Sequence, residues 1–176
     1  VSEFSGEDFK FNYGTVTVVK PKGESRADLI IIKSMRNFNI DSVDLTNQKI
    51  YSSTSPMGKY LDLNTDNKRI TVYNAIGDKK GIEALYSGAV TTICYGETAV
   101  EIYISEKTEQ NIKAESTEPN ENGETVIHSG DKEFIISKDY TDTGREMPKL
   151  GQTYKFKLDC LGYVVEITNV SSDYGV

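Results

Sequence analysis

The amino-acid sequence predicts an all-β fold, arranged as two small β-barrel or sandwich-like units in tandem. Short apolar stretches alternate with polar residues in the period of two that is typical of half-buried strands. Polar turns separate these stretches at close spacing, as they do in small barrels and sandwiches. No segment places apolar residues at helical spacing across more than two turns. These three observations together favour strands over helices.

The first half of the chain contains five of the expected strands and one helical turn. Residues 14–19 alternate between polar and apolar side chains, which predicts a half-buried strand. Residues 29–32 are continuously apolar, and such a run predicts a strand covered on both faces. The remaining elements of this half are strands at residues 69–73, 89–95 and 99–104, short hairpins at residues 43–51 and 61–70, and a helical turn at residues 82–86.

Residues 69–102 of the first half are matched by residues 133–167, which follow a polar segment at residues 105–123. Domain boundaries favour polar, exposed chain, so we expect an N-terminal unit at residues 1–107 and a C-terminal unit at residues 108–176. In both halves a strand leads through a long loop and a glycine, Gly88 or Gly151, into a hairpin that ends in Val-Glu-Ile. The expected strands of the second half are one near Ile112 and others at residues 124–127, 133–137, 153–158 and 163–168.

Composition and charge exclude several classes of protein. With 37% hydrophobic residues, the chain of 176 residues carries too much apolar surface for a mostly disordered protein. The longest uninterrupted apolar run, residues 29–32, is too short for a membrane-spanning helix. A net charge of −7 argues against nucleic acid as a partner, because phosphate binding uses clustered Lys and Arg.

The sequence offers no catalytic, cofactor-binding or metal-binding residues. A Ser–His–Asp arrangement would need His128, the only histidine, which we expect to lie partly exposed in a turn. A closed zinc site uses four ligands, whereas Cys94, Cys160 and His128 are the only Cys and His side chains. The two cysteines belong to different predicted units, and we expect them to remain unpaired. We therefore predict a protein that is not an enzyme and needs no cofactor.

Acidic side chains at two places could in principle bind calcium or form a catalytic pair. Residues 139–144 superficially resemble a calcium loop, but Leu150 stands where an EF-hand has its bidentate Glu. This segment is therefore expected to be a solvated acidic loop. Asp44 and Asp62 each lie between apolar neighbours in strand-like runs, so both should point to solvent.

Tyrosines are the one chemically distinctive population. Such rings pack into a core and still present a polar tip to water or to a sugar hydroxyl. Packing in the core and at barrel rims is one reading, and an aromatic platform for carbohydrate is the other. The tyrosines in or beside expected strands are Tyr51, Tyr60, Tyr73, Tyr86, Tyr95, Tyr103, Tyr140, Tyr154 and Tyr163.

The stretch from Leu150 to Asp159, continuing into Leu161-Gly162-Tyr163-Val164-Val165, resembles the closing hairpin of a known kind of module. These are small β-barrel repeat modules of surface proteins from Gram-positive bacteria, often accompanied by S-layer homology domains. The preceding strand of that pattern is matched by residues 130–137, and Cys160 and Tyr163 depart from it. The resemblance to this family implies no catalytic residues in this sequence.

This resemblance implies a non-catalytic structural or adhesive module of an extracellular, cell-surface protein. Its partners would be neighbouring modules of the same surface protein and cell-wall glycan. The alternative is a glycan- or cell-wall-binding module, including one from a phage tail. Further copies of the repeat in flanking sequence would favour the first function, and loss of glycan binding on mutation of tyrosines would favour the second.

Overall fold

The computed structural model describes residues 13–23, 28–64, 68–96 and 98–170, and it is mostly β-strand, as predicted. Its two short helical elements are a 3-10 turn, η2 (Ile82–Ala84), and a helix, α1 (Lys138–Asp142). The strands are β1 (Gly14–Val19), β2 (Leu29–Asn39), β3 (Ser42–Asp44), β4 (Lys49–Tyr51), β5 (Tyr60–Asp62), β6 (Arg69–Tyr73), β7 (Lys79–Lys80), β8 (Val90–Tyr95), β9 (Ala99–Ser105), β10 (Thr108–Lys113), β11 (Ser116–Pro119), β12 (Thr125–Ser129), β13 (Lys132–Ile135), β14 (Thr153–Leu158) and β15 (Val164–Asn169).

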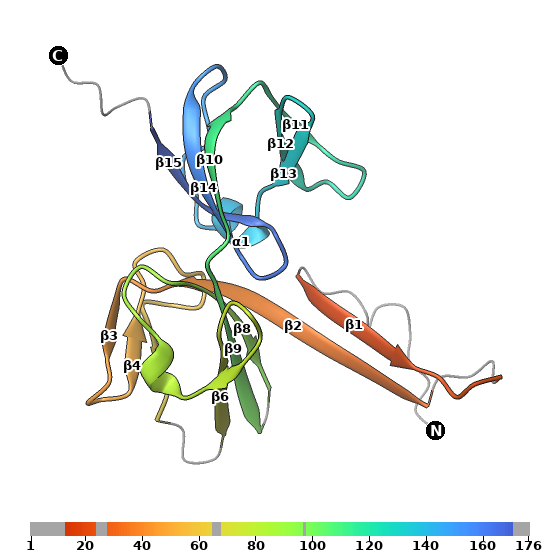
Figure 1. The fold of residues 1–176 in the computed structure, drawn as a ribbon, viewed down its shortest axis with the longest axis vertical. Helices are drawn as coiled ribbons and strands as arrows, with labels where there is room; N and C mark the ends of the chain where they lie inside the picture. The colour runs from red at the N-terminus through yellow and green to blue at the C-terminus, as the bar shows by residue number, and fades with distance from the viewer. Residues whose placement is uncertain (1–12, 24–27, 65–67, 97, 171–176) are drawn as a thin grey trace.

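The strands form one six-stranded sheet and three three-stranded sheets. The large sheet has the order β1-β2-β8-β9-β6-β7, and β3-β4-β5 lies with it in the lower body of Figure 1. The sheets β10-β14-β15 and β11-β12-β13 form the upper body together with α1. The connection between β9 and β10 joins the two bodies (Figure 1).

Buried apolar side chains form two separate clusters, one in each body. The N-terminal core contains Phe38, Ile40, Ile50, Leu63, Val72, Leu85, Ala89, Ile93, Val100, Ile102 and Ile104. The C-terminal core contains Ile112, Ala114, Ile127, Phe134, Ile136, Tyr140, Tyr154, Phe156 and Val164. The division into units 1–107 and 108–176 as domains stays a prediction, because independent folding of each unit is a property of the isolated fragment.

The described residues contain no closed barrel, so the predicted barrels do not form as such. In the C-terminal body, a single isolated bridge between Ile136 and Val164 connects the end of β13 with β15. The chain turns into α1 directly after that bridge, so β13 cannot extend along β15 and complete a ring of hydrogen bonds. The result is two small sheets that share one core.

The first half of β2 and all of β1 form a two-stranded arm that projects from the lower body (Figure 1). The body begins where β2 pairs with β8, from Met35 onward. Residues 29–32 were predicted to be covered on both faces, and this prediction is wrong: Leu29 is 52% exposed and Ile31 is 40% exposed. Among the described residues, this part of β2 pairs only with β1, and its pairing with β8 begins at Met35.

The two halves of the chain share a local geometry that the sequence pattern anticipated. Gly88 precedes β8 with a φ of 84°, and Gly151 precedes β14 with a φ of 83°. Each glycine donates its N–H to a carbonyl, that of Ile40 for Gly88 and that of Ala114 for Gly151, in both cases at 2.7 Å. In both halves the hairpin that follows ends in a strand, β9 or β15, that runs parallel to an earlier segment.

Other local predictions had mixed outcomes. The hairpin at residues 43–51 is confirmed by the pairing of β3 with β4, and η2 lies within the expected helical turn. The hairpin at residues 61–70 is wrong, because β5 pairs with β4 whereas β6 pairs with β9 in the large sheet. Residues 65–67 of that expected turn lie outside the described residues. Helix α1 was not predicted.

Candidate functional site

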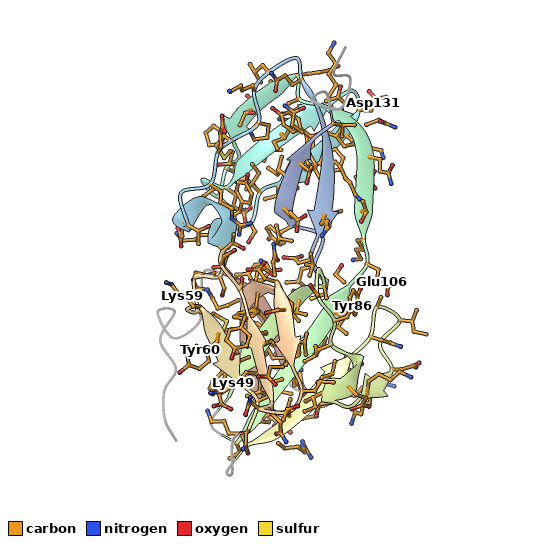
Figure 2. The ribbon with its side chains drawn as sticks, turned by 90° about the vertical axis from the view of Figure 1, so that its left-hand side faces the viewer. Lys49, Lys59, Tyr60, Tyr86, Glu106 and Asp131 are labelled. Atoms are coloured by element: carbon orange, nitrogen blue, oxygen red, sulfur yellow. The ribbon has the colours of Figure 1, made fainter. Side chains whose placement is uncertain are left out.

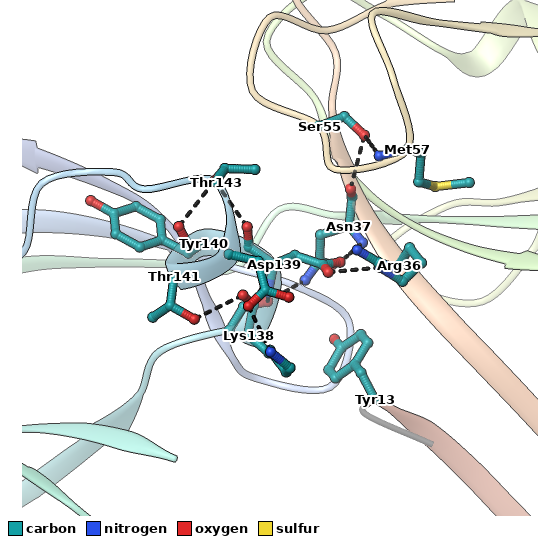
Figure 3. Close-up of polar contacts among 12 residues, drawn as sticks. Tyr13, Arg36, Asn37, Ser55, Met57, Lys138, Asp139, Tyr140, Thr141 and Thr143 are labelled. Atoms are coloured by element: carbon teal, nitrogen blue, oxygen red, sulfur yellow. Dashed lines mark hydrogen bonds and ion pairs between the residues drawn. The ribbon is translucent and has the colours of Figure 1, made fainter. Parts of the chain in front are cut away.

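A cluster of polar side chains, all of them buried except Arg36, lies where the two bodies meet, and we call it the junction (Figure 3). Its members are Tyr13, Arg36, Asn37 and Thr92 from the N-terminal part, and Ser137, Asp139 and Asp159 from the C-terminal part. Strand β2 supplies Arg36 and Asn37 at the point where it leaves the arm and enters the body. Buried polar groups of this kind are stable only when they are hydrogen-bonded.

Asn37 is the centre of the junction and is 3% exposed. Its Nδ2 donates to Ser137 Oγ at 2.8 Å and to Asp159 Oδ2 at 3.2 Å. Its Oδ1 accepts a hydrogen bond from Thr92 Oγ1 at 3.2 Å. The side chain therefore uses both its donor and its acceptor groups, and it links the N-terminal body to two segments that lie 100 and 122 residues away in sequence.

Asp139 makes the second connection, from the first turn of α1. The carboxylate accepts from the backbone N of Asn37 at 2.6 Å and from Arg36 Nε at 2.7 Å. The helix begins here because Ser137 caps it, its Oγ accepting from the backbone N of Asp139 at 3.2 Å. The capped turn thus presents a buried carboxylate to the edge of β2, and Arg36 supplies the opposite charge.

Asp159 is fully buried in the turn between β14 and β15. Its Oδ1 accepts from the backbone N of Leu161 and of Tyr163, each at 2.9 Å. Its Oδ2 accepts from Asn37 and from the hydroxyl of Tyr13. Burial raises the pKa of Asp159 despite these donors, and burial together with the charge of Asp159 raises the pKa of Tyr13.

Longer side chains extend the contact around the junction. Asn39 Nδ2 donates to the carbonyl of Val165 at 3.1 Å, and Arg145 Nη2 donates to the carbonyl of Thr54 at 3.4 Å. Lys107 Nζ donates to the carbonyl of Cys160 at 3.0 Å, and Lys157 Nζ donates to that of Gly88 at 3.3 Å. Contacts from β2, α1, β14 and β15 therefore surround the buried cluster and resist rotation of one body against the other.

A cavity of about 500 Å³ lies directly beside the junction. Tyr13 and Ile136 form its buried floor, with exposed fractions of 7% and 2%. Its other lining residues come from the β11–β12 loop, from the start of α1 and from the β14–β15 hairpin: Asn122, Gly123, Glu124, Thr125, Lys138, Thr141 and Tyr163. Because Tyr13 belongs to the N-terminal part, the cavity has all its walls only when the two bodies are in contact.

The one histidine and the two cysteines, the candidate zinc ligands of the sequence, lie at separate places in the structure. His128 lies in β12 rather than in a turn, with Nε2 3.0 Å from Glu118 Oε1 and Nδ1 3.7 Å from Glu133 Oε1. Cys94 and Cys160 are free thiols on different bodies, and burial raises the pKa of each. In the described part of the chain, no three His, Cys, Asp or Glu side chains gather into a possible metal site.

The acidic segment at residues 139–144 differs from the expected solvated loop. It contains most of α1, and Asp139 is 4% exposed because β2 covers it. Asp44 and Asp62 meet the prediction of solvent-facing carboxylates. Asn47 donates two hydrogen bonds to Asp44 and so lowers its pKa, and Asp62 lies 3.8 Å from Lys49 Nζ.

The tyrosines differ in burial, and core packing is confirmed for two of them. Tyr140 and Tyr154 are buried in the C-terminal core, whereas Tyr60 and Tyr86 are exposed at separate places on the N-terminal body (Figure 2). Tyr51 and Tyr60 lie on neighbouring strands with ring centroids 6.2 Å apart, and other surface or half-buried tyrosines are Tyr73, Tyr95, Tyr103 and Tyr163. Tyr13, which no strand pattern identified, is the tyrosine that holds the junction.

Among the described residues, no helix combines the length and apolar character that crossing a membrane requires. Comparisons of the chain with protein-family models, with curated proteins and with solved structures found no match.

Proposed function

We propose that this chain is a non-catalytic structural module of a bacterial cell-surface protein, with neighbouring modules of the same protein as its partners. The observation that carries the proposal is the junction, where two bodies with separate cores are held together by buried, mutually satisfied polar groups. Such an arrangement fixes the distance and angle between the bodies. A module that spaces or assembles a surface protein needs a fixed geometry, which a flexible linker would not provide.

The arm gives further support to a role in assembly. Its strands expose apolar side chains, among them Val18 at 57% and Leu29 at 52%, and β1 is the edge strand of its sheet among the residues that the structure describes. Contiguous apolar surface of this kind usually marks a contact with another protein surface. The strand β1 also contains no charged residue, and charge is a common means of blocking pairing at an edge.

The experiment that tests the proposal is fractionation of the cells that produce the parent protein, combined with an activity screen of this chain. We expect an antibody against the chain to detect the parent protein in the cell-wall fraction and on intact cells. We also expect no turnover above blank with ester, peptide and glycoside substrates. Recovery of the parent protein only from the cytosolic fraction, or turnover that increases with protein concentration, would overturn the proposal.

A further inference from the structure

We propose that the cavity beside the junction binds a short neutral saccharide. This inference goes beyond the structural role and does not depend on it. Small-molecule sites are preferentially found where two bodies meet, and the cavity volume of about 500 Å³ lies within their usual range of about 300–1,000 Å³. Three features of the cavity favour a sugar: a preformed loop, an aromatic pair and a balanced set of polar groups.

The β11–β12 loop that forms one wall is held in shape by Asn120. Its Oδ1 accepts from the backbone N of Asn122 at 3.0 Å and from that of Glu124 at 2.9 Å. Its carbonyl accepts from the backbone N of Gly123 at 2.9 Å. A ligand that enters the cavity therefore meets a loop that is already ordered, and binding loses little free energy to ordering it.

Tyr13 and Tyr163 provide the aromatic surface. Their ring centroids are 5.1 Å apart with an interplanar angle of 84°, so the rings meet edge to face. Tyr163 is half-buried, and its hydroxyl donates to Oε1 of Glu124, another lining residue, at 3.3 Å. A sugar ring has an apolar C–H surface beside its hydroxyls, and an aromatic ring with a polar tip complements both.

The charges of the lining favour a neutral ligand. Glu124 and Lys138 are its charged residues and have opposite signs, and Lys138 Nζ also contacts Asp142 Oδ1 at 2.6 Å. Threonine hydroxyls, an asparagine amide and a carboxylate supply both donors and acceptors, as sugar hydroxyls require. The net charge of −7 disfavours polyanionic ligands such as nucleic acids.

The test is a titration of the isotope-labelled full chain, followed by amide NMR shifts, with three disaccharides used separately. Cellobiose and diacetylchitobiose are neutral, and digalacturonic acid is the anionic probe. We expect saturable shifts at Asn122, Gly123 and Thr125 with at least one neutral disaccharide. Tyr163→Ala should abolish them, and Asn122→Ala, which changes an exposed side chain, should weaken binding by about 2- to 10-fold, the equivalent of one hydrogen bond.

Tyr60→Ala is the matched control. Tyr60 is 55% exposed beside Tyr51 on the other body, so it could form a flat sugar platform of its own. We expect this variant to bind as the unmodified chain does. The inference is overturned if neither neutral disaccharide shifts the lining amides, if digalacturonic acid binds more tightly than both, if Asn122→Ala leaves binding unchanged, or if Tyr60→Ala abolishes it. None of these results would alter the proposed structural role.

Discussion

Replacing Asn37 with Ala tests whether the junction couples the two bodies. The variant loses two neutral hydrogen bonds, with Ser137 and Thr92, and one with the carboxylate of Asp159. A neutral hydrogen bond contributes about 0.5–1.5 kcal/mol and one to a charged group about 1.5–3 kcal/mol. Since water can enter the space and replace part of these bonds, we expect a loss of about 2–4 kcal/mol in the free energy of unfolding.

The loss should also change how the protein unfolds. We would follow urea denaturation by NMR, reading the amide of Val72 in the N-terminal core and that of Val164 in the C-terminal core. In the unmodified chain both signals should disappear at the same urea concentration, because the junction links the bodies. In Asn37→Ala the less stable body should unfold first, so the two midpoints should separate.

The control is Asn47→Ala, whose exposed side chain donates one hydrogen bond to Asp44 Oδ2 in the same turn. We expect it to change the free energy of unfolding by less than about 0.5 kcal/mol, as is usual for surface substitutions. A loss below about 1 kcal/mol for Asn37→Ala, with coincident midpoints for the two cores, would refute the reasoning.

Four further predictions concern the pH dependence of stability, the turn at Gly151, the arm and the isolated C-terminal unit. Burial raises the pKa of the Asp159 carboxyl group in the folded state, so protonation of this group stabilises the fold. This stabilisation is complete below about pH 3.9 and is lost as the pH rises through the pKa of the folded state. Unmodified protein should therefore gain stability relative to Asp159→Asn as the pH falls from about 7 to about 4 in urea denaturation, and a constant difference would contradict this. Gly151→Ala should cost about 1–2 kcal/mol in the same assay, since Ala at a φ of 83° is strained although its Cβ meets no atom within 4 Å; a loss below about 0.5 kcal/mol would argue against this account. The exposed apolar surface of the arm should make the isolated chain self-associate at high concentration. Val18→Lys combined with Ile30→Glu, a cross-strand pair on the arm, should reduce this self-association in concentration-dependent light scattering, and an unchanged mass distribution would show that the arm does not mediate it. The fragment 108–176 should give dispersed amide signals but unfold at lower urea than the full chain, because Asp159 loses its side-chain partners from the N-terminal part; a random-coil spectrum would show that the fragment does not fold alone.

Local sequence patterns predicted the strands well because the alternation of apolar and polar side chains in a strand involves residues that are adjacent in sequence. Residues 14–19 and 153–158 coincide with β1 and β14 for this reason. The two glycine-led hairpins were also visible, since Gly88 and Gly151 both occupy a backbone conformation that favours glycine. The sequence pattern could not predict burial. Residues 29–32 show this, because an apolar run does not reveal whether another layer of the protein covers it.

The junction could not be predicted because its contacts are remote in sequence. Tyr13 and Asp159 are separated by 146 positions, and Asn37 and Asp139 by 102. Asp159 has the local features of a turn residue, and its partners Tyr13 and Asn37 come from the distant N-terminal part of the chain. The one local signal was Ser137 with Asp139 two residues later, a helix start, but a five-residue helix has no apolar periodicity to support it.

The most direct test of the central claim, that the junction makes the two bodies one rigid unit, is the rotational correlation time of each body from NMR relaxation of backbone amides. Amides of β8 and β9 report on the N-terminal body, and those of β14 and β15 report on the C-terminal body. We predict a single correlation time for both sets, equal to that of one particle containing all 176 residues. Two different and shorter correlation times, each typical of a body tumbling on its own, would contradict the account.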